Sequence, residues 1–159
     1  MQPHSPERCR PDDPRLPAIL SLIQRAFAYM DSRIDPPSSM TRLTLADIAK
    51  QCETGEVWVV GDPPVACVFF KELDGCLYLG KLAVDDTARG QGLARRMVDL
   101  AVERAAARGL PEVELQARVE LVENHAAFTK MGFRKTGETA HAGYDRPTSI
   151  TMRKPVTHP

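Results

Sequence analysis

The sequence predicts an α/β protein of the α+β type, with one mixed, mostly antiparallel sheet of about six or seven strands flanked by helices. Three observations support this fold class. The chain has 159 residues, of which 43% are hydrophobic, enough for one sizeable core. No proline occurs between residues 65 and 110, so this window can hold central strands and a full helix. The predicted elements also lack a regular βαβαβ alternation.

Four helices are predicted from apolar residues that recur at helical spacing. Thr44 and Asn124 are expected to be N-caps, because short polar side chains accept hydrogen bonds from the first free N–H groups. Gly109 and Gly132 are expected to end two of these helices. The predicted helices span residues 18–29, 44–52, 93–108 and 124–131.

Strands are predicted where β-branched and aromatic residues concentrate, or where apolar and charged residues alternate. The segment Gly61-Asp62-Pro63-Pro64 is typical of a turn and joins the first two strands as a hairpin. Asp74-Gly75 separates the second strand from the third. The predicted strands span residues 57–60, 65–71, 76–84, 112–118, 133–139 and 149–153.

Composition and charge exclude several classes of protein. Lys plus Arg and Asp plus Glu both number 21, so the basic excess of a nucleic-acid-binding protein is missing. No apolar run is long enough to span a bilayer, and the first 15 residues are too polar for a signal peptide. We therefore expect a cytoplasmic domain at residues 18–155, with a proline-rich leader at 1–17, a tail at 156–159, and neither nucleic acid nor membrane as a partner.

The cysteines and histidines do not indicate a metal site. The four cysteines contain no C-x-x-C pair, and the four histidines do not supply the close ligand pairs that zinc sites use. Cys67 and Cys76 lie in apolar, strand-like runs, where a reduced thiol acts as a small hydrophobic side chain. We expect no metal cofactor.

The most informative segment is a glycine pair that opens the long helix beginning near residue 93. N–H groups at a helix start lack partners and carry the positive end of the helix dipole. Gly90 and Gly92 would let a phosphate approach the backbone closely, and Arg89 adds a side-chain cation. A plain tight turn would use the same glycines. A Walker loop is excluded because no Gly-Lys-Ser/Thr follows, and Arg95 at the third glycine position disfavours a dinucleotide fingerprint.

Three segments together resemble the GNAT superfamily of acyl-CoA-dependent N-acetyltransferases. Arg89-x-x-Gly92-x-Ala94 is similar to the family's pyrophosphate loop, Gln/Arg-x-x-Gly-x-Gly/Ala. Leu82-Ala83-Val84-Asp85 looks like the family's fourth strand, and Phe128-x-Lys130-x-Gly132-Phe133 like its aromatic segment. The resemblance implies the family's fold, in which the sheet is splayed between the fourth and fifth strands.

The resemblance also implies acetyl-CoA as co-substrate, without a metal. The acceptor would be the primary amine of a small molecule, or of a protein or peptide, and it would attack the thioester directly in a ternary complex. The pyrophosphate would lie on the glycine loop. The pantetheine arm would lie along the strand that resembles the family's fourth, at Leu82 to Val84. The residues expected to contact acetyl-CoA are Leu82, Ala83, Val84, Arg89, Gly90, Gln91, Gly92, Leu93, Ala94, Asn124 and Phe128.

The sequence departs from the family at Phe128, where GNAT enzymes often place a tyrosine as general acid. A phenyl ring cannot donate a proton, so we expect Tyr144, within the polar cluster at residues 141–146, to supply the acid. Glu114, one of four glutamates in or near the predicted strand 112–118, is expected to be the base, directly or through water. Simpler interpretations are that Phe128 only packs in the core, that residues 141–146 form a simple turn, and that Glu114 is only solvated.

The acceptor pocket is expected to include Tyr29, Arg33 and His141. Asp31 and Asp35 beside Arg33 give this loop a mixed charge, which would suit an amine that also carries a carboxylate. The rival function is a non-catalytic sensor or interaction module that binds acyl-CoA on the same fold. The sequence does not decide whether the protein is a homodimer.

Overall fold

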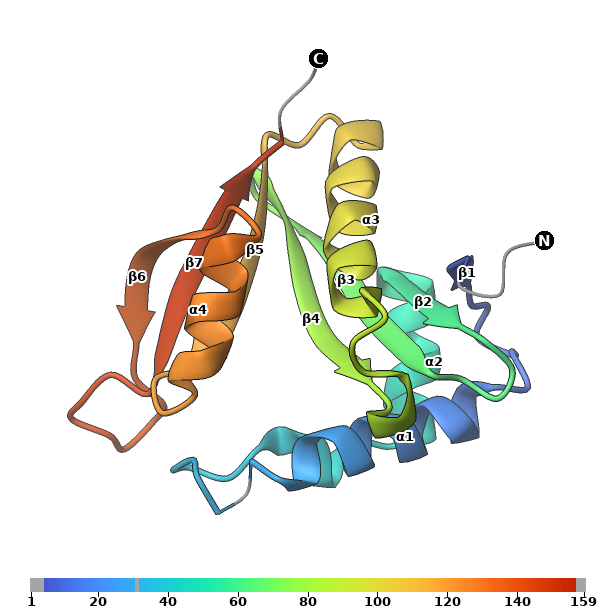
Figure 1. The fold of residues 1–159 in the computed structure, drawn as a ribbon, viewed down its shortest axis with the longest axis horizontal. Coiled ribbons are helices and arrows are strands. Elements are labelled where there is room, and N and C mark those ends of the chain that lie inside the picture. Colours follow the sequence, from blue (N-terminus) through green and yellow to red (C-terminus); the bar gives the residue numbers. More distant parts are fainter. Residues whose placement is uncertain (1–4, 31, 157–159) are drawn as a thin grey trace.

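A computed structural model describes residues 5–30 and 32–156, so Asp31 lies outside the described residues. One seven-stranded sheet carries helices on both faces (Figure 1). The strand order is β1-β2-β3-β4-β5-β7-β6, and every neighbouring pair is antiparallel except β4 and β5. The elements are β1 (Glu7–Arg8), α1 (Leu16–Ala28), η1 (Ser39–Arg42), α2 (Leu45–Thr54), β2 (Glu56–Val60), β3 (Ala66–Leu73), β4 (Cys76–Val84), η2 (Asp86–Ala88), α3 (Leu93–Ala107), β5 (Glu112–Arg118), α4 (Val122–Lys130), β6 (Arg134–Thr139) and β7 (Ser149–Pro155).

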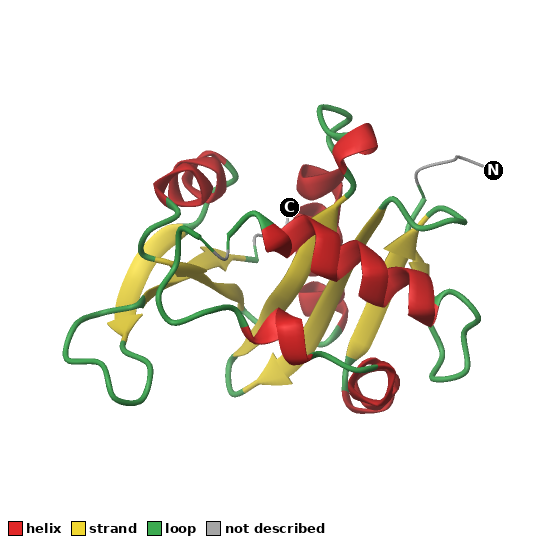
Figure 2. Ribbon diagram, turned by 90° about the horizontal axis from the view of Figure 1, so that it is seen from below, coloured by secondary structure: helices red, strands yellow, loops and turns green. Residues whose placement is uncertain are grey.

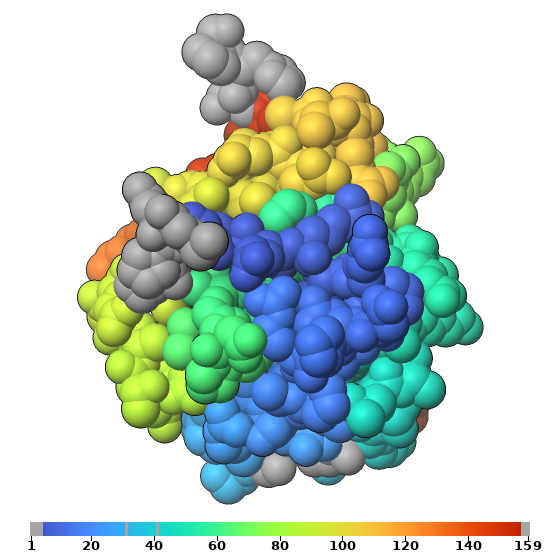
Figure 3. Space-filling view, turned by 90° about the vertical axis from the view of Figure 1, so that its right-hand side faces the viewer, coloured from blue at the N-terminus to red at the C-terminus, as the bar shows by residue number. Residues whose placement is uncertain are grey.

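The predicted fold class is confirmed, and each predicted helix and strand is present with bounds that differ by a few residues. The short strand β1 was not predicted. It lies in the proline-rich segment expected as a leader, where it pairs with β2, and the following Cys9 is only 4% exposed. In Figure 3 the segment preceding α1, coloured blue, lies against the rest of the molecule. At least part of the predicted leader is therefore packed into the domain.

The helix caps agree with the sequence at one predicted position and differ at another. Thr44 and Asp47 form a capping box at α2, as the predicted cap requires. The expectation that Asn124 caps α4 is wrong, because α4 begins at Val122 and Asn124 lies in its first turn. The preceding Leu121 is buried against Met30, so apolar packing starts the helix earlier than the polar side chain suggested.

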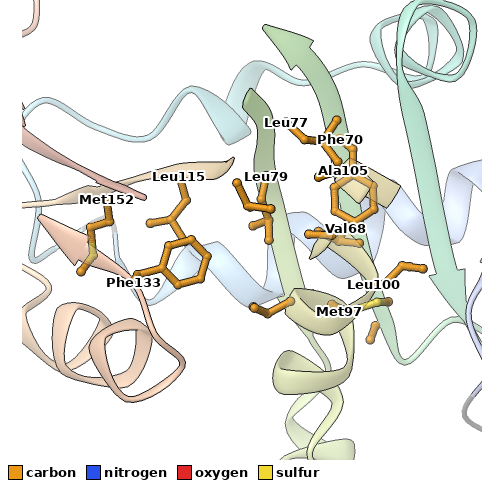
Figure 4. Packing of buried hydrophobic residues seen from close by; sticks show 14 of the residues in the cluster. Val68, Phe70, Leu77, Leu79, Met97, Leu100, Ala105, Leu115, Phe133 and Met152 are labelled. Atoms are coloured by element: carbon orange, nitrogen blue, oxygen red, sulfur yellow. The ribbon is translucent and has the colours of Figure 1, made fainter. Parts of the chain in front are cut away.

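Two hydrophobic cores cover the two faces of the sheet. Alternate residues of β3 divide between them, since successive strand side chains point to opposite faces. Val68 and Phe70 pack toward α3, whereas Cys67 and Phe69 pack toward α1 and α2. In Figure 4 the α3-side core continues past Leu79 to residues of the β5–β7 half. The α3-side core therefore connects both halves of the sheet.

The sheet is splayed between β4 and β5. These parallel strands pair only from Cys76–Tyr78 to Glu112–Glu114. Farther along β4, Lys81 and Leu82 together oppose the single residue Val68 of β3, and Lys81 has a φ of 50°. Such a β-bulge bends a strand and ends regular pairing. Figure 1 shows the result, with β4 and β5 together at one end and far apart at the end near α1.

A buried carboxylate connects β2 to α3. Glu56 is 1% exposed and accepts hydrogen bonds from Trp58 (2.8 Å), Arg104 (2.8 Å) and Arg108 (2.6 Å). Burial alone would raise the pKa of Glu56, but the hydrogen bonds from Arg104, Trp58 and Arg108 outweigh burial and lower the pKa to about 2. Arg108 also binds the half-exposed Glu72. Glu56 therefore holds α3, whose first residues face the splay, against the sheet.

We predict that Glu56→Gln lowers the free energy of unfolding by about 1.5–3 kcal/mol, because it removes the buried carboxylate that accepts charged hydrogen bonds from Arg104 and Arg108, two partly exposed arginines. Glu72→Gln is the matched control and should cost less than about 1 kcal/mol, because exposed pairs contribute little. Denaturant titration measures both. The folded pKa of Glu56 lies below the ordinary value of 4.5, so its contribution is present above that value and is lost as pH falls toward 2. An equal loss in both variants would contradict this account.

Candidate functional site

A cleft of about 1120 Å³ occupies the splay between β4 and β5. The splay divides the sheet into two halves, one made of β1 to β4 and the other of β5, β7 and β6, and both halves contribute walls to the cleft. One end is formed by the start of α3 and by α4, including Gly92 and Phe128, and the other by the segment after α1, including Tyr29 and Met40. Seen from below, the strands of the two halves lie apart (Figure 2). The cleft therefore passes between the two halves from the α3–α4 side toward α1.

The start of α3 presents backbone N–H groups to this cleft. The first intrahelical hydrogen bond runs from the Arg96 N–H to the Gly92 carbonyl (2.9 Å), so the three preceding residues have no acceptor within the helix. Gly90 and Gly92 have φ of 79° and 76°, and a Cβ at either position would meet open space. These N–H groups and the helix dipole form a favourable site for an anionic group such as a phosphate.

Two arginines at this end can add charge to that site. Arg89 pairs with Asp86 at 3.0 Å and Arg95 with Asp99 at 3.5 Å. All four side chains are more than half exposed, and ion pairs between exposed groups are weak. Both arginines line the cleft and are free to exchange these partners for a phosphate.

The edge of β4 supplies a second binding element. Leu82, Ala83 and Val84 line the cleft. On one side this end of β4 pairs with β3, but in the described residues β4 has no ladder partner in β5 beyond Tyr78. An exposed strand edge can accept an extended chain that carries amide groups. The cleft thus combines an anion site with a strand edge.

Most residues expected to contact acetyl-CoA lie along the cleft. All of them except Gln91 line it, and Gln91 stands between the two glycines. The half-buried Phe128 meets Phe133 edge to face, with 5.7 Å between ring centroids, so it has a core contact as well as a cleft-facing position. Their contact with acetyl-CoA stays a prediction.

The residues expected at the acceptor pocket, Tyr29, Arg33 and His141, also line the cleft. Arg33 is paired with Glu123 at 2.7 Å. The ring and the backbone N–H of His141 contact the hydroxyl of Thr148. Tyr29 is 47% exposed. Tyr29 and Arg33 follow α1 in the chain, whereas His141 lies in the β6–β7 connection, so the cleft brings two distant segments together.

The structure does not bring Tyr144 and Glu114 to the cleft, because neither is among its lining residues. The Tyr144 hydroxyl donates to Asp35 at 2.6 Å, and this bond raises the pKa of Tyr144 above its usual value. Glu114 accepts from Nε and Nη2 of Arg153 at 3.0 and 2.9 Å. The geometry therefore favours structural contacts for both side chains over the acid and base roles expected from sequence.

Residues 33–37 form a strap that joins the two halves at the open end of the splay. Arg118, at the end of β5, donates to the carbonyls of Pro36 (2.7 Å) and Pro37 (3.2 Å). The Asp35 N–H donates to Glu120 (3.2 Å), and the Asp35 carboxylate accepts from Tyr144. The strap fixes the α1 side of the cleft to β5 and to the β6–β7 connection.

Among the cleft-lining residues that sequence reasoning missed, Tyr78, Lys81 and Arg118 carry polar or charged groups. Burial, together with the charge of Glu114, raises the pKa of Tyr78. Burial lowers the pKa of Lys81, whose Nζ lies 5.3 Å from the centroid of the Phe69 ring. A lysine inside a predicted apolar strand could have marked Lys81 as unusual. Its position at the cleft, however, depends on the bulge in β4, which the sequence did not predict.

Comparisons with known proteins agree with this geometry. Residues 16–133 match the model of the acetyltransferase (GNAT) family. The mycothiol acetyltransferase of Beutenbergia cavernae is 30% identical over an alignment 144 positions long, which covers 82% of this chain and 44% of that protein. This chain thus spans less than half the length of that relative.

Solved structures share the fold. An acetyltransferase from Streptococcus agalactiae superposes with a TM-score of 0.74 at 15% identity, covering 98% of this chain and 99% of the other. The ribosomal-protein-S18-alanine N-acetyltransferase of Escherichia coli gives 0.69 at 18% identity, covering 98% and 96%.

None of the described helices combines the length and the apolar character that a membrane span requires. No group of three or more His, Cys, Asp or Glu side chains among residues 5–30 and 32–156 is arranged to hold a metal ion.

We predict that Gly92→Ala reduces the rise in melting temperature that acetyl-CoA causes, because the added methyl group enters the space in front of the anion site. Wild-type protein at a hundred times the dissociation constant should gain about 2.7 kcal/mol. Gly109→Ala is the matched control, since Gly109 has a similar φ of 70°, also faces open space, and ends the same helix away from the cleft. Thermal denaturation with and without acetyl-CoA distinguishes them, and an undiminished shift in Gly92→Ala would contradict the assignment.

Proposed function

This chain belongs to the GNAT family of acetyltransferases, and on that premise we propose that it transfers an acetyl group from acetyl-CoA to a primary amine. The observation that carries the proposal is the coincidence, in one cleft, of the α3 amide groups and the unpaired edge of β4. The first suits a pyrophosphate and the second an extended amide-bearing arm. The acceptor amine would enter from the end formed by the segment after α1.

The chain's own groups would bind and orient both substrates. Acetyl-CoA supplies an activated acetyl thioester. Gly90 to Ala94, with Arg89 and Arg95, would hold its phosphates, and Leu82 to Val84 would align its arm toward the narrow end of the splay. Alignment of this kind makes the attack effectively intramolecular. Backbone N–H groups of β4 at the splay are suited to stabilise the oxyanion.

We propose that no dedicated side-chain acid is needed. CoA can leave as thiolate, because a thiol of ordinary pKa near 8.5 is a tolerable leaving group, and the proton that the attacking amine loses passes to water in the cleft and on to the thiolate. Of the three tyrosines, Tyr29 and Tyr78 line the cleft, whereas Tyr144 holds Asp35 of the strap. Tyr144 would then act as a positioning residue for the acceptor pocket.

The direct test is release of CoA from acetyl-CoA in the presence of a panel of primary amines. We expect CoA and the N-acetylated amine to appear in equal amounts, without an acetylated protein intermediate in mass spectra. Acetyl-CoA binding that raises the melting temperature, with no turnover on any amine, would instead support the non-catalytic sensor.

Tyr144→Phe separates positioning from acid catalysis. If Tyr144 only fixes the strap, the variant should raise KM for the amine several-fold and leave kcat at saturating amine within about twofold. Loss of a general acid would instead lower kcat by about 10²–10⁴-fold. Tyr78→Phe is the control within the cleft. A large fall in kcat for Tyr144→Phe alone would restore the acid role expected from sequence.

A further inference from the structure

The cleft concentrates positive charge in a chain whose net charge is zero. Six of its lining residues are basic and two are acidic. The basic residues are Arg25, Arg33, Lys81, Arg89, Arg95 and Arg118, and the acidic ones are Asp86 and Glu123. Phosphate groups would account for Arg89 and Arg95 at the α3 end. The charge on the remaining surface of the cleft needs a different explanation.

Most of these cations already have carboxylate partners. Arg25 pairs with Asp85 at 2.9 Å, and Arg33 pairs with Glu123. Lys81 and Arg118 differ, because no carboxylate of the described residues lies within 4.0 Å of either cationic group. Both belong to the strands that diverge, Lys81 at the bulge of β4 and Arg118 at the end of β5.

The surroundings of Lys81 make an unpaired charge unfavourable. Burial partly desolvates its ammonium, which lowers the pKa of Lys81, while Asp47 and the contact with the Phe69 ring favour the charged form without neutralising it. Arg118 is held rigidly, since two of its nitrogens bind the strap carbonyls. An anion placed between the strands would stabilise both cations, whereas a second ammonium group would be repelled.

We infer that the acceptor of this chain carries a carboxylate close to its primary amine, and that Lys81, with Arg118 beside the strap, selects it. The inference rests on the proposed acetyl transfer and narrows its substrate class. Small amino acids fit it directly, and a peptide amino terminus followed by an acidic side chain offers the same chemistry. Polyamines and aminoglycosides, which carry several ammonium groups, do not fit. Glu123, the carboxylate at this end, is engaged by Arg33 and does not compensate Lys81.

The test compares matched amines at saturating acetyl-CoA. A set of amino acids with different side chains is assayed beside the corresponding carboxamides and decarboxylated amines, together with spermidine, and each rate is divided by the fraction of neutral amine. We expect kcat/KM for the best amino acid to exceed that of its carboxamide at least tenfold. Dipeptides are assayed as well, with aspartate or glutamate as the second residue and with the carboxyl terminus amidated. They show whether a peptide with an acidic side chain is a better acceptor than a free amino acid.

Variants assign the selection to Lys81. Lys81→Met should reduce the preference for the carboxylate at least tenfold, and Lys81→Arg should retain most of it. Lys135→Met is the matched control, because Lys135 is half exposed on β6, pairs with Glu138 and does not line the cleft. The acetyl-CoA-induced rise in melting temperature verifies that each variant folds.

The outcomes separate the two claims. Equal or better use of carboxamides or spermidine by the wild type, or an unchanged preference in Lys81→Met, would overturn the carboxylate inference while leaving acetyl transfer intact. No CoA release with any amine would overturn the proposed function itself, and the inference with it.

Discussion

The early end of pairing between β4 and β5 is the constraint on which the rest of the structure depends. Three residue pairs hold these parallel strands together, and the bulge at Lys81 then turns β4 away. Separating two central strands exposes backbone groups that a sheet would otherwise pair, which is unfavourable unless another molecule or water satisfies them. The same separation creates the cleft, frees the strand edge and places the start of α3 at its side. An extended amide-bearing ligand is the natural complement to such an opening.

Two sets of polar contacts hold the separated halves in place. Glu56 ties α3 to β2 through Arg104 and Arg108, so the helix start that faces the cleft is fixed from its far end. At the open end, Arg118 and Tyr144 bind the strap of residues 33–37. A cleft that is rigid before its ligand arrives loses less conformational entropy on binding. These contacts explain why a sheet with so few central pairs can still present an organised site.

Local patterns in the sequence were sufficient to predict the helices, the strands and the glycine loop. Periodicity, turn residues and glycines with positive φ all act over a few neighbouring residues. The strand β1 has only two residues, too few to show such periodicity. The start of α4 depends on the burial of Leu121, which the local sequence does not reveal. The positions of Tyr144 and Glu114 outside the cleft could not be predicted for a related reason. Their partners Asp35 and Arg153 lie 109 and 39 residues away in sequence, so only the fold reveals that both side chains are already engaged. Lys81 was missed because one bulge redirects it.

Hydrogen–deuterium exchange of the intact protein, with and without acetyl-CoA, tests the central claim most directly, since it reports on backbone N–H groups individually. The account predicts slower exchange on binding at residues 82–84 and 90–95, and little change in the β2–β3 hairpin away from the cleft. Protection confined to other parts of the sheet, or none at the start of α3 while acetyl-CoA is bound, would contradict it.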